Sequence, residues 1–309
     1  KELWIGIGGL QGFFNAFHAY PTAWVEDDSG NLVWGATQPE MKDALAALQE
    51  MYTDGAIDEE FAVKDFNRAA ENVIAGNAGM TFGQVWVPLW PFQQAKQNEP
   101  DLELVVMPIP SIDDEPARAE VQVGIDGYTV VSEECEHPEA VVTMLNLFLE
   151  KVEYGSAEDI QTYSMTDAGS QYFKYTNVKA WSPIKNLEMF AQRRRAIETG
   201  DTSGMMGDAQ VTYEYVSGYI EDPSDAVGWS YAKYMGLEGC SWDGIAHYRE
   251  NDLLVLNEFY GAPTTTMVQK QATFDQMLLE IITQITVGQP VDTYDDFIEN
   301  WRKLGGDDM

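Results

Sequence analysis

The sequence predicts an α/β protein with two domains, and two strand-then-helix units carry this prediction. In the first unit, an apolar segment at 78–82 is followed by a helical pattern near 85–88. In the second, the segment 121–132 begins with strand-like alternation, ends continuously apolar and precedes a strong helix at 138–151. The chain has 309 residues, of which 45% are apolar, so it can bury the cores of two domains.

The stretch 71–92 contains the two most prominent aromatic residues of the first unit. Trp86 and Trp90 lie four residues apart, so they share one face of the helix that begins after the 78–82 strand. Open α/β sheets bind ligands at the carboxyl ends of their strands. Both indoles are therefore candidate ligand contacts, and a place in the core is the alternative for each.

The charge of the chain limits its partners. The formal net charge is -33, which repels nucleic acid and anionic membranes and opposes polyanionic substrates. A neutral or cationic small ligand is compatible with this field. The chain also has 15 tyrosines and 9 tryptophans, which suit the faces of sugars or peptides, although we expect most of them in the core.

Metal, disulfide and membrane signals are weak. Cys135 and Cys240 form no CxxC pattern, so neither a zinc site nor a disulfide framework is expected, and one disulfide between them stays open. The acidic loop 26–31 lacks the alternating ligands and terminal glutamate of a calcium loop, which favours a solvated turn around Asp27. No segment reaches the roughly 20 consecutive apolar residues of a transmembrane helix.

Catalytic motifs are also missing from the sequence. The three histidines are scattered, and no HExxH, GxSxG, GxGxxG or GxxxxGK[ST] pattern occurs. With 51 acidic residues, some pair of carboxylates always has glycosidase spacing, so such pairs carry little information. We expect no enzyme, no catalytic residue, no cofactor and no metal.

The remaining elements follow from local periodicity and breakers. We expect a strand at 1–8, a helix at 10–20, a hairpin of 24–25 with 32–34, a strand at 102–108, and helices at 38–53, 61–75, 185–199, 208–220, 225–234, 264–286 and 294–304, the last closed by Gly305 and Gly306.

Several segments, taken in order, resemble a known family over nearly the whole chain. They are 13–20 with Trp24, 46–55, 66–86, 106–110, 130–146, 263–267 and the ending 301–306 (WRKLGG). Together they are similar to bacterial extracellular solute-binding protein family 1, the maltose-binding-protein-like sugar receptors of ABC importers, in their Gram-positive lipoprotein branch. Compared with that family, the chain lacks an N-terminal part that carries the secretion signal, the lipid anchor and the first strands of one lobe.

This resemblance implies a type II periplasmic-binding-protein-like fold. Two α/β lobes are joined by hinge crossings, near 108–111 and 261–264. Residues 1–108 and 261–309 would form the C-terminal-type lobe, and 109–260 part of the N-terminal-type lobe, whose first strands are absent from this chain. The truncation would leave lobe one incomplete.

The implied function is that of a monomeric extracellular carbohydrate receptor. It would capture a mono- or oligosaccharide between its lobes and deliver it to ABC importer permease subunits, with no nucleic-acid partner. Its location would be the cell surface, as a lipoprotein attached to the membrane through an N-terminal lipid anchor, or the periplasm. Alternatives are the same fold binding a peptide, polyamine or other cationic solute, and a secreted glycosidase.

The resemblance also implies ligand contacts. An aromatic ring stacks on the apolar face of a sugar, while amides and carboxylates bind its hydroxyls. Trp86 matches the stacking aromatic, Gln11 and Phe13 match contacts from the first helix, and Asp126 and Tyr128 face the cleft from the other lobe. Further candidates are Trp90, Trp229 and Trp242. Core packing is the alternative for these aromatic residues and for Phe13, and a plain turn for Asp126.

Overall fold

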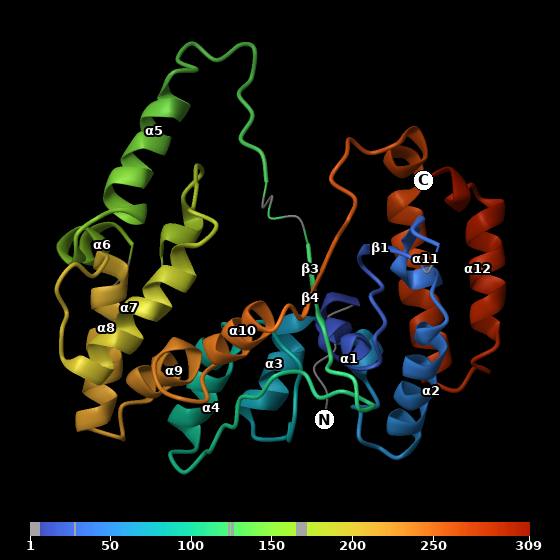
Figure 1. Ribbon diagram of the computed structural model, residues 1–309, viewed down its shortest axis with the longest axis horizontal. Helices are drawn as coiled ribbons and strands as arrows, with labels where there is room; N and C mark the ends of the chain where they lie inside the picture. Colours follow the sequence, from blue (N-terminus) through green and yellow to red (C-terminus); the bar gives the residue numbers. More distant parts are fainter. Residues whose placement is uncertain (1–6, 28, 123, 125–126, 165–171) are drawn as a thin grey trace. The chain divides into compact units, whose positions relative to one another are not determined.

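Figure 1 shows the computed structural model of the chain, which describes residues 7–27, 29–122, 124, 127–164 and 172–309. The chain divides into two compact units. Unit 1 comprises Lys1–Gln84, Met107–Val123 and Ile245–Met309, and unit 2 comprises Val85–Val106 and Gly124–Gly244. The chain therefore passes between the units four times.

Unit 1 combines helices with two small sheets. In chain order it contains η1 (Ile7–Leu10), α1 (Gln11–Ala16), β1 (Trp24–Glu26), β2 (Leu32–Trp34), η2 (Gly35–Thr37), α2 (Glu40–Thr53), η3 (Phe61–Val63), α3 (Phe66–Ile74), β3 (Ala119–Val121), β4 (Leu254–Leu256), α11 (Thr265–Thr286), α12 (Thr293–Lys303) and η7 (Gly306–Asp308). β1 pairs with β2 in an antiparallel hairpin, and β3 pairs with β4 in parallel. The last boundary between the units falls within α10 (Ser241–Glu250).

The core of unit 1 forms where α2, α11 and α12 run alongside one another (Figure 1). Each helix presents an apolar stripe to this core, represented by Leu45 on α2, Phe274 on α11 and Tyr294 on α12. The hydroxyl of Tyr294 donates a hydrogen bond to the carbonyl of Ala36 at 2.6 Å, which satisfies its buried polar atom. Full burial of each such side chain contributes about 1.5–3 kcal/mol to folding.

In the described part of unit 2, every regular element is a helix. Unit 2 contains η4 (Val87–Leu89), α4 (Phe92–Asn98), α5 (Ala140–Phe148), the π-helical turn η5 (Leu149–Glu153), α6 (Ala157–Tyr163), η6 (Tyr172–Tyr175), α7 (Lys185–Thr199), α8 (Gly207–Glu221) and α9 (Ala226–Met235). Its core joins α6, α8 and α9, where the rings of Tyr215 and Tyr231 stack at 4.8 Å between centroids. Lys185 is buried between the carboxylates of Glu153 and Asp208, at 3.2 Å from each.

The longer helices agree with the sequence expectations, and the longer strands do not. The helix expected at 10–20 ends at Ala16, and the helix expected at 61–75 is divided into η3 and α3. α2, α7, α8, α9, α11 and α12 lie within two residues of their predicted bounds. The expected strands at 78–82 and 102–108 are irregular, and among the described residues of 121–132 only residue 121 belongs to a strand. The expected first strand, 1–8, lies almost wholly outside the described residues. A strand requires a neighbour for its backbone hydrogen bonds, and no described segment pairs with 78–82 or 102–108.

The boundaries of the units also differ from the expected lobes. Residues 109–123 belong to unit 1 because Ile112 N–H donates to the Ala16 carbonyl at 3.0 Å and because β3 pairs with β4. Residues 85–106 belong to unit 2, where η4 and α4 pack on α9. The family lobes themselves stay a prediction.

An apolar surface remains exposed on α5. Val142 and Leu147 are 59% and 54% exposed, and Met144 is exposed as well, while Phe148 at the end of the helix is buried. Met144 and Leu147 are three positions apart and therefore lie on one face of the helix, and exposed apolar side chains of this kind are found at sites of association.

Candidate functional site: a tryptophan-lined pocket in unit 1

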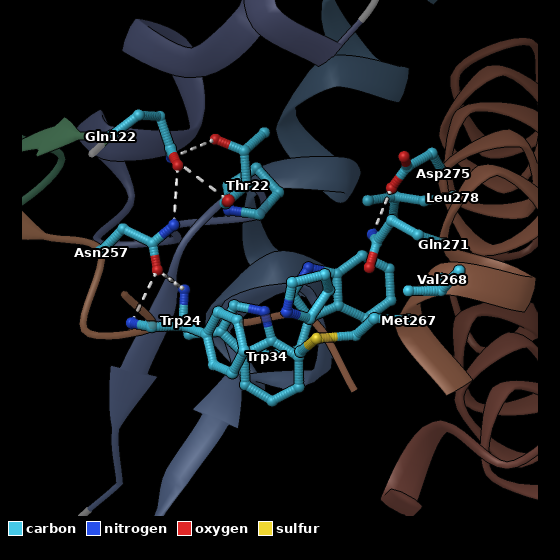
Figure 2. Close-up of a pocket in the computed structure, with 13 residues that line it drawn as sticks. Thr22, Trp24, Trp34, Gln122, Asn257, Met267, Val268, Gln271, Asp275 and Leu278 are labelled. Carbon is cyan, nitrogen blue, oxygen red and sulfur yellow. Dashed lines mark hydrogen bonds between the residues drawn. The ribbon is translucent and has the colours of Figure 1, made fainter. Parts of the chain in front are cut away.

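A pocket of about 530 Å³ opens in unit 1 between the hairpin, the ends of β3 and β4, and the first turns of α11. Figure 2 shows the side chains that form it. It is lined by Pro21, Thr22, Trp24, Trp34, Gln122, Asn257, Phe259, Pro263, Met267, Val268, Gln271, Asp275 and Leu278. This volume is in the range of small-molecule sites.

The hairpin supplies the aromatic wall of the pocket. Trp24 on β1 and Trp34 on β2 are directly paired across the two strands, so their indoles share one face of the hairpin. The ring of Phe259 lies 5.9 Å from that of Trp24, centroid to centroid. Trp34 is buried and Trp24 is half-buried, so Trp24 is the indole that keeps more accessible surface.

The turn of the hairpin is fixed by Asp27. Its carboxylate accepts hydrogen bonds from the backbone N–H groups of Ser29 and Asn31, both at 2.9 Å. These bonds, led by that from Asn31, hold the pKa of Asp27 below its ordinary value. Gly30 adopts the left-handed conformation (φ 76°) that closes the turn. The carboxylate thus acts within the turn, as expected for a solvated loop.

A pair of amides forms the polar wall. Val121 and Leu256 are register partners in the β3–β4 ladder, so the residues that follow them, Gln122 and Asn257, are also neighbours. Asn257 Nδ2 donates to Gln122 Oε1 at 2.8 Å. Asn257 Oδ1 accepts from the backbone N–H groups of Trp24 (3.2 Å) and Phe259 (3.1 Å). One side chain therefore connects the aromatic wall to the β3–β4 ladder.

A buried carboxylate supports this wall from behind. Glu120 is 7% exposed and accepts hydrogen bonds from Thr22 Oγ1 (2.5 Å), Gln122 Nε2 (3.1 Å) and Asn15 Nδ2 (3.5 Å), and from the side chain of Gln11. Burial raises the pKa of Glu120, and these donors offset part of that effect. Because Thr22 and Gln122 both line the pocket, Glu120 is a positioning residue.

Helix α11 forms the opposite wall. Met267, Gln271 and Asp275 are spaced by four residues and therefore lie on one face of the helix. Thr264 caps the helix by accepting a hydrogen bond from Met267 N–H at 3.2 Å. Gln271 Nε2 donates to Asp275 Oδ1 at 2.8 Å. Among the thirteen lining residues, all of which the structure describes, Asp275 is the single charged one.

The residues predicted from the sequence lie elsewhere. In unit 1, Gln11 reaches Glu120 behind the pocket, and Phe13 is buried in the core, 6.0 Å from the ring of Phe82. Gly12 permits that contact, since a Cβ there would lie 2.7 Å from Phe82 Cδ1. Phe13 therefore has the core role that was its alternative.

The other predicted residues belong to unit 2. Trp86 and Trp90 flank η4 and are half-buried, and η4 packs on α9, which carries the buried Trp229. Lys96 Nζ lies 5.4 Å from the Trp229 ring. Trp242 is also buried, and Tyr128 is 84% exposed. None of these described side chains lines the pocket, and Asp126 lies outside the described residues.

Sequence reasoning did not identify this pocket, although one half of it carries a signal in the sequence. The expected hairpin is symmetric about its acidic turn, which places Trp24 opposite Trp34, so the pair of indoles could have been recognised. The contact between Gln122 and Asn257 could not be recognised from the sequence, because these residues are 135 positions apart and meet through the β3–β4 pairing.

The described residues give no sign of a metal centre, a disulfide or a membrane-spanning helix. In the described ranges, no group of three or more His, Cys, Asp or Glu side chains could hold a metal ion. Cys135 is exposed, Cys240 is buried, and both are free thiols. Among the helices of the described chain, none is long and apolar enough to cross a membrane.

Comparisons with known proteins give one informative relationship. No family model matches the chain. It is similar to lipoprotein LipO of Bacillus subtilis (strain 168), with 23% identity over 321 residues. This alignment includes 99% of the chain and 57% of LipO, so the chain spans little more than half the length of this relative. The similarity fits the Gram-positive lipoprotein part of the sequence-based resemblance.

Proposed function

We propose that this protein is an extracellular carbohydrate-binding receptor whose pocket in unit 1 holds a mono- or oligosaccharide for delivery to an ABC importer. The observation that carries the proposal is the pairing of Trp24 with Trp34 beside the Gln122–Asn257 amides. Sugars present an apolar C–H face and a rim of hydroxyls. Aromatic rings suit the first, and amide side chains suit the second.

The geometry of the polar wall favours recognition of hydroxyl groups. The backbone of Trp24 and Phe259 fixes the carbonyl oxygen of Asn257, so its amide nitrogen is directed toward Gln122. Gln122 Nε2 in turn donates to Thr22 Oγ1 at 3.1 Å and to Glu120. A preorganised set of polar groups binds a neutral ligand without an added cost of ordering them.

Binding without hydrolysis is the activity that this pocket supports best. Glycoside hydrolysis uses two carboxyl groups that flank the scissile bond. The pocket has one carboxylate, Asp275, on the α11 wall. Receptor function therefore requires fewer assumptions than the glycosidase alternative.

Location and partners rest on the relationships of the sequence. The name of LipO supports a cell-surface position for this protein as well. Delivery to permease subunits rests on the resemblance to the solute-binding family. The resemblance alone points to Trp86, Trp90 and Tyr128 in unit 2, which is a rival placement of the ligand site to the pocket proposed here.

The proposal is tested by isothermal titration calorimetry of the chain with a panel of neutral oligosaccharides, combined with an assay for released reducing ends. We expect a saturable binding signal with one class of sugar and no release of reducing ends. Absence of binding across monosaccharides and oligosaccharides of several linkages would contradict the receptor proposal, and turnover would favour a glycosidase.

A further inference from the structure

We propose that the pocket prefers a sugar carrying a free amino group, whose ammonium is held by Asp275 while the sugar ring lies against the tryptophans. This inference rests on the carbohydrate-binding function proposed above and specifies the chemical class of its ligand. It follows from the placement of the one charged lining residue and from the charges around the aromatic wall.

Asp275 is positioned to accept a hydrogen bond from a ligand. Figure 2 shows Gln271 and Asp275 on one side of the pocket, the Gln122–Asn257 amides on the other, and the two indoles between them. Gln271 Nε2 donates to Asp275 Oδ1 and so orients the carboxylate. A carboxylate accepts several hydrogen bonds, which leaves capacity for the N–H groups of an ammonium.

The aromatic wall also suits a cation. Indole and phenyl rings attract ammonium groups over their faces, and three such rings line this pocket, those of Trp24, Trp34 and Phe259. A neutral sugar uses the rings for stacking alone. An amino sugar uses the same rings and adds an electrostatic contact.

Further negative charge lies beside this wall. Glu26 follows Trp24 by two positions on β1, and Glu258 N–H donates to the Trp24 carbonyl at 2.9 Å. The Tyr260 hydroxyl donates to the Glu258 carboxylate, and this bond, together with the charge of Glu26, raises the pKa of Tyr260. Both carboxylates therefore contribute a negative potential next to Trp24 and Phe259.

The cationic residues on α11 and just before β3 are engaged elsewhere. Lys270 on α11 donates to the carbonyl of Leu304 at the end of α12. Arg118, just before β3, donates to the carbonyl of Leu254 at 3.0 Å. Neither residue lines the pocket. With a net charge of -33 on the whole chain, the field favours a cationic ligand over its neutral analogue.

Three β1,4-linked glucose-type trisaccharides test the inference by calorimetry, because they share one skeleton. Cellotriose carries hydroxyls, N,N′,N″-triacetylchitotriose carries neutral amides, and chitotriose carries free amines. Below the pKa of the sugar amines, we expect chitotriose to bind about tenfold or more tightly than cellotriose. Asp275→Asn should abolish that preference and leave the affinity for cellotriose unchanged. Raising the salt from about 0.05 M to about 0.5 M should weaken chitotriose alone.

A matched control lies on the same helix. Gln276 Nε2 donates to Glu280 Oε1 at 2.9 Å, the same type of pair one turn away from the pocket lining, so Glu280→Gln should keep the preference for chitotriose. Equal binding of cellotriose and chitotriose, or an unchanged preference in Asp275→Asn, would overturn the inference and leave the carbohydrate proposal standing. Spermidine binding as tightly as chitotriose would also overturn it, because the sugar would then be irrelevant. Failure of all three trisaccharides to bind, while other neutral sugars bind, would likewise overturn it.

Discussion

Trp24 and Trp34 are directly opposed across the β1–β2 hairpin, and together they form the aromatic wall of a pocket whose polar wall is built by residues far away in the sequence. Trp34 is fixed by the core, with its ring 5.6 Å from that of Trp301. Trp24 is less buried and faces Phe259. One indole therefore anchors the hairpin in unit 1, and the other is available to a ligand.

Replacing Asn257 by alanine should weaken both the fold and ligand binding. The change removes the acceptor of the Trp24 and Phe259 N–H groups and the donor to Gln122. Loss of these partners should lower the free energy of unfolding by about 1–3 kcal/mol, measured by urea denaturation. Asn251→Ala is the control, because the side chain of the exposed Asn251 bonds locally, to His247 four residues earlier. Equal stabilities of the two variants would contradict the bridging role of Asn257.

Asp58 should make unit 1 sensitive to acid. A hydrogen bond from Lys64 at 2.7 Å is the main reason that the pKa of Asp58 is lowered to about 2 from an ordinary value of 3.8. A carboxyl group with a lowered pKa in the folded state contributes stability above its unfolded pKa, and this contribution is lost as the pH falls from 3.8 toward 2. Asp58→Asn should therefore cost about 2 kcal/mol at neutral pH and less than about 0.5 kcal/mol near pH 2. A cost that is constant over this range would refute the assignment.

Glu120 should have the opposite dependence on pH. Burial raises its pKa above the ordinary value of 4.5, so the folded state binds a proton more tightly than the unfolded state does. The stability associated with this group is present below pH 4.5 and is lost as the pH rises through the folded pKa. As the pH rises, the wild type should lose this stability and Glu120→Gln should not, so the variant should become more stable relative to the wild type. Parallel stability curves for the two proteins would show that burial does not affect Glu120 in this way.

The exposed face of α5 should promote self-association of the chain. Met144 and Leu147 are exposed, so replacing both by glutamate should change the free energy of unfolding by less than about 0.5 kcal/mol. The double variant should bind less of an apolar dye and sediment as a smaller species at high concentration. Phe148→Ala is the contrasting change, since Phe148 is buried and its loss should cost about 3–5 kcal/mol. Unaltered dye binding by the double variant would contradict this role of the α5 face.

The helices could be predicted from the sequence because their signals are local. α11 has an apolar stripe, a capping threonine at Thr264 and a breaker at Gly288, all within one segment. The segment 102–108 (LELVVMP) also has a local signal, a short apolar run, and exposed and less exposed residues alternate along it in the structure. Segment 102–108 forms no strand because a strand also needs a neighbouring strand to pair with, and the local sequence pattern does not determine that neighbour.

The candidate site was harder to predict than the helices. Its aromatic half lies in one hairpin and could be inferred from the pairing of Trp24 with Trp34. Its polar half depends on the parallel pairing of β3 with β4, two strands of three residues each that are separated by all of the second part of unit 2. The amino-acid pattern of one sequence does not indicate that β3 pairs with β4 and not with another segment.

The most direct test compares two tryptophan variants in the same calorimetric titration with the best neutral oligosaccharide. Trp24→Ala removes the accessible indole of the pocket, whereas Trp86→Ala removes the indole that the family resemblance implies in unit 2. We expect Trp24→Ala to lose about 1–3 kcal/mol of binding free energy, the scale of a hot-spot aromatic residue, and Trp86→Ala to bind like the wild type. Full affinity in a correctly folded Trp24→Ala variant, with binding lost in Trp86→Ala, would contradict the assignment of the ligand site to the unit 1 pocket.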